Sequence, residues 1–294
     1  MSNVLELKNV TKKYTDFTLD NVSFSVPKGC ICGVIGQNGA GKTTTISLIL
    51  DIIKKDGGTI EVMGQSMEEK GVSLKEEIGV VYDEMGFHDF MTPNEINTMM
   101  KYVYKNWQQD TFFEYLKRFS LPRNKRCGAF SRGMRMKLQI AVALSHNASL
   151  LIMDEPTSGL DPIVRNEMLQ IFQEYVMDEN HTILLSSHIT GDLERIADMV
   201  VFIDHGKIVL SGNKDEILEK HGLIKCKKEE VESIDKEDVV SVRKSAFGAE
   251  VLVSDKEKCS KKYEKMVMEN IALEDIMIFY VNREMEKEHG RTDL

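Results

Sequence analysis

The chain has 294 residues, of which 42% are hydrophobic and 29% charged, a composition typical of a globular protein with one large domain and room for a small second one. Its 47 Asp and Glu residues outnumber its 38 Lys and Arg residues, and this acidity argues against DNA or RNA as a partner. No apolar run approaches the roughly 20 residues of a membrane-spanning helix, and the N-terminal residues do not resemble a secretory signal, so we expect a cytosolic protein.

The cysteines are scattered and follow neither a Cys-x-x-Cys pattern nor a Cys/His ligand pattern. They are Cys30, Cys32, Cys127, Cys226 and Cys259. We therefore expect reduced thiols, with neither a disulfide framework nor a structural zinc site.

The beginning of the chain predicts strands, a glycine loop and a helix. Alternating apolar residues predict strands within residues 1–30, and the uninterrupted apolar run 30–35 predicts a strand buried on both faces. Glycines break the pattern between Gly36 and Gly41, after which apolar residues recur at helical spacing up to Ile53.

The middle of the chain predicts alternating strands and helices. A hairpin is expected near residues 57–64, a strand at 78–82 and mostly helices at 92–144. Further buried strands are expected at 150–153, 183–185 and 200–203. Strands that alternate with helices predict an α/β fold with a mainly parallel sheet.

The composition changes after residue 220, where charges of both signs become frequent. Strand-like segments at 239–242 and 249–253 and a helix-like segment at 272–280 interrupt them. We interpret residues 1–220 as the main domain and residues 221–294 as a small α/β appendage. A partly disordered tail is the alternative.

One motif lies between the predicted strand and helix near residue 40 and matches Gly-x-x-x-x-Gly-Lys-Thr. Its residues are Gly36, Gln37, Asn38, Gly39, Ala40, Gly41, Lys42 and Thr43. Glycines let backbone N–H groups converge on phosphates, and the helix N-terminus adds the positive end of its dipole. Lys42 can reach the β- and γ-phosphates, and the Thr43 hydroxyl can ligate Mg²⁺. The motif predicts a nucleotide-phosphate site.

Two carboxylates, Asp154 and Glu155, follow the predicted strand at 150–153. Downstream of a phosphate loop, Asp154 is placed to hold Mg²⁺, directly or through water, and Glu155 to polarise an attacking water. His188 ends a later strand. A lone histidine there usually has no special role, but in this series we interpret it as a sensor of the γ-phosphate.

A second anion site is predicted between these motifs, in the sequence Phe-Ser-Arg-Gly-Met at residues 130–134. The Ser131 hydroxyl and the Gly133 N–H can cap the helix that follows. In isolation an ordinary N-cap would be the simpler interpretation, but the place just upstream of the Asp154–Glu155 strand favours the anion site.

The ordered set of motifs resembles one family, the ATP-binding subunits of ABC transporters, over about residues 3–215. The resemblance implies a P-loop NTPase core, an N-terminal antiparallel β-subdomain and an inserted helical subdomain at about residues 86–147. It also implies ATP and Mg²⁺ as ligands.

The resemblance assigns roles to particular residues. Gly36 to Thr44, with Thr44 included, would be the Walker A loop, and Asp154 and Glu155 the Walker B pair. Tyr14 would stack on adenine, and His188 would be the switch histidine. Ser131 to Met134 would form the signature loop and Ser158 to Asp161 the D-loop, which makes Ser131, Gly133 and Asp161 nucleotide-contacting residues.

Two positions depart from the family's pattern. The usual Leu-Ser-Gly-Gly-Gln is here Phe-Ser-Arg-Gly-Met, which keeps Ser131 and Gly133. The usual Gln after the strand at 78–82 is replaced by Asp83, which could approach Mg²⁺ or the water with a shorter reach and a full charge. Both features resemble bacterial export-type ATPases of the bacitracin-resistance and acetoin-utilisation kind.

The resemblance leads us to expect an ATP-hydrolysing subunit, at the inner face of the cell membrane, that drives a separate membrane permease, an exporter. The second expected partner is another ATPase subunit, identical or different, and no nucleic acid is expected. The alternative is a non-transport ABC ATPase of the DNA-repair or ribosome-associated type. The single cassette, the lack of sustained heptads and the net acidity weigh against that alternative.

Aromatic residues close to Asp83 are candidates for docking a cytoplasmic helix of the permease. They are Phe87, Phe90, Tyr102, Tyr104 and Trp107. The alternative is that these rings fill the core of the helical subdomain.

Overall fold

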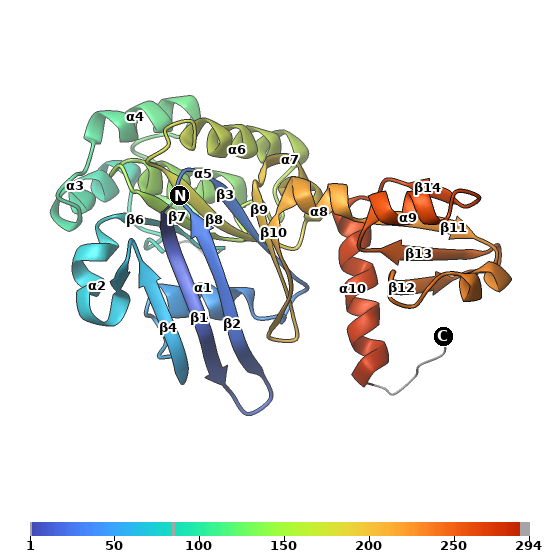
Figure 1. The fold of residues 1–294 in the computed structure, drawn as a ribbon. Coiled ribbons are helices and arrows are strands. Elements are labelled where there is room, and N and C mark those ends of the chain that lie inside the picture. The colour runs from blue at the N-terminus through green and yellow to red at the C-terminus, as the bar shows by residue number, and fades with distance from the viewer. Residues whose placement is uncertain (1, 84–85, 289–294) are drawn as a thin grey trace. The chain divides into compact units, whose positions relative to one another are not determined.

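The computed structural model describes residues 2–83 and 86–288 (Figure 1). The chain divides into two compact units, Met1–Leu210 and Ser211–Leu294. The sequence placed this division at residue 220. In the structure, helix α8 (Lys214–Lys220) contacts α9 (Lys256–Lys262) within the second unit, a packing relation that composition alone does not reveal.

An antiparallel sheet with the strand order β2-β1-β4-β5 begins the first unit. Its strands are β1 (Asn3–Lys13), β2 (Thr18–Pro27), β4 (Gly57–Val62) and β5 (Gln65–Ser66). Leu5 pairs with Val26 and Val62 on the two neighbouring strands, and all three side chains are buried. Such cross-strand apolar rows fix the register of the sheet.

The central sheet of the first unit has the order β10-β9-β3-β8-β7-β6, and the pairs among β6, β7, β8, β3 and β9 are parallel. Its strands are β3 (Ile31–Ile35), β6 (Ile78–Val81), β7 (Leu150–Asp154), β8 (Thr182–Ser187), β9 (Met199–Asp204) and β10 (Lys207–Asn213). Every residue of β3 and β7 is buried, as expected for strands covered on both faces. The expected α/β fold with a parallel sheet is confirmed.

One hydrophobic core joins the two sheets through α1 (Lys42–Ile49). Ile46 and Ile49 of this helix share a buried cluster with Leu5 of the antiparallel sheet and Leu150 of the parallel sheet. In the view of Figure 1, α1 lies behind β1 and β2. The other helices of the first unit outside the helical insertion are α2 (Met67–Lys75), α6 (Pro162–Tyr175) and α7 (Thr190–Ile196).

The segment between β6 and β7 is helical. It contains α3 (Pro93–Val103), α4 (Gln109–Arg118), a short 3₁₀ turn at Cys127–Ala129 and α5 (Arg132–Leu144). Helix α3 begins with a reciprocal cap, because Glu95 N–H donates to the Thr92 hydroxyl at 3.3 Å and Thr92 N–H donates to the Glu95 carboxylate at 2.8 Å.

The second unit is a small α/β structure, as the sequence predicted for the appendage. Its antiparallel sheet has the order β12-β13-β11-β14. The elements are α8, β11 (Gly222–Cys226), a 3₁₀ turn at Lys228–Ser233, β12 (Val239–Lys244), β13 (Ala249–Val253), α9, β14 (Val267–Glu269) and α10 (Leu273–Glu288). Across residues 2–83 and 86–288, no helix has both the length and the apolar character needed to span a bilayer.

Candidate nucleotide-binding site

The loop between β3 and α1 is shaped by its glycines. A Cβ atom at Gly36 would lie 2.4 Å from the carbonyl oxygen of Ile203 in β9, so only glycine fits there. Gly39 and Gly41 adopt φ angles of 82° and 114°, which favour glycine. Helix α1 begins directly after Gly41, and the N–H groups of its first turn therefore open onto the loop.

Lys42 is buried beneath this loop, and its ammonium group is surrounded by oxygens. Nζ donates to the carbonyl oxygens of Gly36 at 2.7 Å and Gln37 at 3.2 Å. It also lies 3.1 Å from Oε1 of Glu155. One buried positive charge is thus placed between the glycine loop and the carboxylate that follows β7, where an incoming phosphate oxygen can replace these partners.

Asp154 is bonded on both carboxylate oxygens. The Thr43 hydroxyl donates to Oδ2 at 2.7 Å, and the Ser186 hydroxyl donates to Oδ1 at 2.5 Å. Burial raises the pKa of the nearby Tyr82 phenol, and the Asp154 charge adds to this effect. The hydroxyl and carboxylate oxygens of Thr43 and Asp154 suit Mg²⁺, which is commonly held by one or two protein groups plus phosphates and water.

No cluster of three His, Cys, Asp or Glu side chains within the described ranges could hold a metal ion by itself. A Mg²⁺ ion held by Thr43 and Asp154 would take its remaining ligands from phosphate oxygens and water, as is usual beside a phosphate loop.

Glu155 occupies a strained position directly after Asp154. Its φ angle is 52°, a left-handed value that costs free energy for a residue with a side chain. The Glu155 N–H donates to the Ser186 hydroxyl at 3.0 Å. Its Oε2 accepts from the N–H of His188 at 3.4 Å and lies 2.7 Å from Nδ1 of the same histidine.

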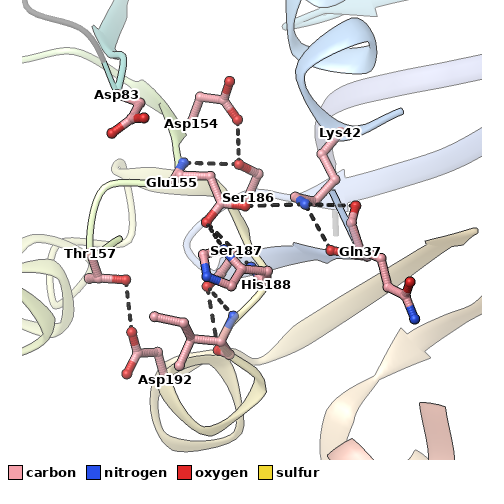
Figure 2. Close-up of polar contacts among 12 residues, drawn as sticks. Gln37, Lys42, Asp83, Asp154, Glu155, Thr157, Ser186, Ser187, His188 and Asp192 are labelled. Atoms are coloured by element: carbon pink, nitrogen blue, oxygen red, sulfur yellow. Dashed lines mark hydrogen bonds and ion pairs between the residues drawn. The ribbon is translucent and has the colours of Figure 1, made fainter. Parts of the chain in front are cut away.

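Figure 2 shows these groups as one continuous cluster, with Glu155 between Lys42 and His188. The cluster forms where the carboxyl ends of parallel strands meet, because Asp154 pairs with Ser186 and Ile35 pairs with Ser187 in the sheet register. The structure therefore brings together the phosphate loop, the two carboxylates and the histidine that the sequence singled out.

Ser131 and Asp83 have partners outside this cluster. The Ser131 hydroxyl caps α5 by accepting from the Met134 N–H at 3.3 Å. Oδ1 of Asp83 accepts from Nη2 of Arg132 at 2.5 Å. A Cβ atom at Gly133 would lie 3.9 Å from the side chain of Leu160, so the Leu160 side chain lies beside the start of α5 within one chain.

A cavity of about 270 Å³ lies beside the phosphate loop. It is lined by Asp16, Phe17, Thr18, Gln37, Asn38, Gly39, Ala40, Asp204 and His205. The family resemblance assigned adenine stacking to Tyr14, whereas the aromatic ring in the cavity wall is Phe17, and the ring centroids of Phe17 and the exposed Tyr14 are 6.4 Å apart. Sequence reasoning missed Phe17, whose aromatic character three residues after Tyr14 was the available signal.

A further pair that sequence reasoning missed lies just before the D-loop and in α7. The hydroxyl of Thr157 donates to the Asp192 carboxylate at 2.8 Å, and both side chains are buried. This bond links the segment after Glu155 to α7, which follows His188. Asp161 caps α6, accepting from the N–H groups of Ile163 and Val164 at 3.1 Å. No sequence pattern marks Thr157 and Asp192 as partners.

The aromatic residues near Asp83 divide into two groups. Phe90 is 66% exposed and Tyr102 is 88% exposed. Trp107 is half-buried and fits the alternative that these rings pack within the helical segment. Its ring packs on Phe112 with centroids 5.3 Å apart, and its Nε1 donates to Asn97 at 2.9 Å.

Comparisons with known proteins identify the family. The family described as ABC transporter matches residues 19–158. The bacitracin transport ATP-binding protein BcrA of Bacillus licheniformis is 36% identical over 71% of this chain and 69% of its own length. The linearmycin resistance ATP-binding protein LnrL of Bacillus subtilis is 30% identical over 86% of this chain and 83% of its own length.

The fold agrees with this assignment. A solved structure of an ATP-binding subunit of an ABC transporter superposes with a TM-score of 0.66 at 28% identity, covering 73% of this chain and 91% of that one. The glycine loop, the two carboxylates and the histidine of this chain lie together as an ATP site requires. The chain therefore belongs to the ABC transporter family, among its ATP-binding proteins.

Proposed function

We propose that the chain is a Mg²⁺-dependent ATPase subunit that lies at the inner face of the cell membrane and powers a separate permease, an exporter. The observation that carries the proposal is the convergence of Lys42, Glu155 and His188, with Thr43 and Asp154 beside them. Phosphoryl transfer to water needs such a set: a cation for the phosphates, ligands for a metal and an anionic acceptor for the water's proton.

In the proposed mechanism Lys42 exchanges Glu155 for phosphate oxygens. The Glu155 carboxylate then accepts the proton of the attacking water. His188, which lies 2.7 Å from Oε2 of Glu155, is positioned to donate to the γ-phosphate. Thr43 and Asp154 would hold Mg²⁺, which when bound neutralises phosphate charge. Lys42 and His188, which contact Glu155 in this structure, are thus the two groups that would bind the γ-phosphate.

The proposed direction of transport, out of the cell, is inferred from the names of two relatives. One is named for bacitracin transport and one for linearmycin resistance, and both names suit the removal of an antibiotic from the cell. An exporter is therefore the form of permease that we propose for this chain.

The permease would dock on the first unit near Asp83. A cavity of about 190 Å³ there has mainly apolar walls that include Tyr104, a ring from the helical segment. The lining residues are Leu50, Ile52, Lys75, Ile78, Val80, Tyr82 and Tyr104. Ile52 is 58% exposed, and a helix of the partner with apolar anchors would cover it.

A second ATPase subunit would complete the site. Ser131 and Gly133 lie at the N-terminus of α5, which carries the positive end of the helix dipole. We propose that this end faces the γ-phosphate held by the Walker A loop of the second subunit, which can be identical or different.

The decisive experiment is the variant Glu155→Gln. It keeps the size of the side chain but loses the anionic acceptor, so turnover should fall by about 10²-fold or more while ATP still binds. ATPase rates of the purified variant and wild type test this, and Glu167→Gln, a change on α6 away from the cluster, is the control. A variant that retains wild-type turnover would contradict the proposed role of Glu155.

Size-exclusion chromatography of Glu155→Gln with and without ATP tests the second subunit. An ATP-dependent dimer supports an identical partner. Proteins that co-purify with the chain from detergent-solubilised membranes would reveal a different ATPase subunit and the permease. If neither a permease nor any other membrane protein accompanies the chain, the proposal of a transport subunit fails, although the ATPase assignment stands.

A further inference from the structure

Arg132, the first residue of α5, contacts two segments besides its own. Its Nη2 donates to Oδ1 of Asp83 at 2.5 Å. A Cβ atom at Gly159 would lie 2.6 Å from Nη1 and 2.9 Å from Cζ of the same guanidinium group. The Arg132 side chain therefore lies against the D-loop backbone while it pairs with Asp83.

Arginine is an unexpected residue at this place in a helix. The first turn of a helix carries the positive end of the dipole, so a cation there is unfavourable for the helix. Ser131 already caps α5, and Arg132 adds nothing to that cap. The pairing with Asp83 compensates the charge, which indicates that the arginine is there for its contacts.

The segment before Asp83 is also tied to α5. Gln139 donates from its amide nitrogen to the Tyr82 carbonyl at 3.0 Å and accepts from the Tyr82 N–H at 3.4 Å. Asp83 directly follows a residue whose backbone is held by this helix. A displacement of α5 would therefore move Tyr82 and Asp83 with it.

We propose that Arg132 is a positioning residue that aligns the Ser131 loop with the D-loop by pairing with Asp83 and packing on Gly159. This inference rests on the proposed function. The guanidinium connects the segment beside the proposed docking cavity, the signature loop and the D-loop within one chain. In this role Asp83 acts through Arg132, and its carboxylate does not act directly on the metal or the water.

A double-mutant cycle tests the proposal with Asp83→Asn, Arg132→Gln and the double variant. Both side chains are 51% exposed, and ion pairs of this exposure change an equilibrium by at most about fivefold. Each single variant should lower ATP turnover by up to about that factor, and the double variant should be no slower than the slower single one. ATP affinity of the isolated chain should stay unchanged, because neither residue contacts Lys42 or the glycine loop.

A third substitution at the same site separates charge from shape. Arg132→Lys keeps the positive charge but not the planar group that both pairs with Asp83 and covers Gly159. It should restore only part of the turnover lost in Arg132→Gln. Full restoration would show that charge alone acts here, and it would overturn the part of the proposal that involves Gly159.

The control is the ion pair between Lys137 and Glu167, which joins α5 to α6 at 2.8 Å. Lys137→Gln and Glu167→Gln should leave turnover unchanged, and circular dichroism should show every variant folded. Two results overturn the inference alone: single effects that multiply in the double variant, which would make Asp83 an independent catalytic group, or single variants with wild-type turnover. A folded wild-type chain without ATPase activity would overturn the proposed function and this inference together.

Discussion

The two sides of the candidate site differ in burial. On the phosphate side, Lys42 and Asp154 are each only 6% exposed, and Glu155 lies between Lys42 and His188. On the signature side, Asp83 and Arg132 are each half exposed. Buried charges must find their partners within the chain, because desolvation without a partner is costly. The buried charges of the phosphate side therefore find their partners within the chain, whereas the Asp83–Arg132 pair on the signature side is open to solvent.

The largest predicted effect on stability also depends on burial. It compares Trp107 with Phe90, two aromatic residues in the segment after Asp83. Trp107→Glu loses its packing on Phe112 and its bond to Asn97, and we expect the free energy of unfolding to fall by about 3 kcal/mol. Phe90→Glu should change it by less than about 0.5 kcal/mol, because the ring is mostly in solvent. Thermal unfolding followed by circular dichroism measures both.

The variant Phe90→Glu also tests whether this ring belongs to the surface that docks on the permease. Phe90→Glu is expected to weaken association with membranes that contain the permease, while ATPase activity of the isolated chain survives. If Phe90→Glu sediments with membranes as well as wild type does, this ring is not part of the docking surface.

On the phosphate side, Lys42→Ala should weaken ATP binding by about 10- to 100-fold, since a hydrogen bond to a charged group contributes about 1.5–3 kcal/mol. Isothermal titration with ATP measures the affinity. Lys54→Ala is the matched control, because Lys54 pairs with Asp51 on the surface. Equal affinities for Lys42→Ala and Lys54→Ala would contradict the assignment of the glycine loop.

On the signature side, Ser131→Arg should leave the chain's own ATP affinity unchanged and abolish ATP-dependent dimerisation. Stability should fall by about 1 kcal/mol, because Ser131 caps α5. Chromatography of the Glu155→Gln protein with and without this second change gives the comparison. A dimer that survives Ser131→Arg would show that the open side does not face a second nucleotide.

Sequence patterns predicted that the residues of the phosphate side would lie together, because each of its segments carries a local motif. The motif from Gly36 to Thr43 carries its own turn and helix, and Asp154 ends an apolar run that can only be a buried strand. Parallel strands then bring these segments together at one edge, so the cluster could be predicted without knowing any side-chain contact.

The signature side was harder to predict because its two charged side chains follow a strand and begin a helix that no sequence motif relates to each other. Asp83 was expected near the metal, whereas in the structure it pairs with Arg132, 49 residues away. Phe17 and Tyr14 are both aromatic and both lie between β1 and β2, and the sequence does not indicate which of them lines the cavity. The domain boundary was predicted at residue 220 from the change in charge density. In the structure the division falls after residue 210, because α8 packs with α9 in the second unit.

The smallest predicted effect concerns pH and the buried His146, at the end of the helical segment. Its ring stacks on the ring of Tyr104 with centroids 3.9 Å apart, and its Nε2 lies 3.3 Å from the Ile78 carbonyl oxygen. Burial lowers the pKa of His146, an effect that the Ile78 carbonyl opposes in part. The unfolded chain takes up a proton at a pH near 6.5, above the pKa of the folded chain, so stability is lost as the pH falls below about 6.5.

Urea unfolding between pH 7.5 and 5.5 tests this, followed by the fluorescence of Trp107, the only tryptophan. Wild type should lose more stability over this range than His146→Phe, which keeps a ring beside Tyr104 but cannot be protonated. His88→Phe is the control, since His88 lies on the surface. Wild type and His146→Phe share the buried His221, whose pKa burial also lowers, so the difference between them belongs to His146. Identical pH dependences of stability for wild type and His146→Phe would mean that the folded chain accepts a proton at His146. The stacked rings of His146 and Tyr104 would then be as accessible to water as the Asp83–Arg132 pair.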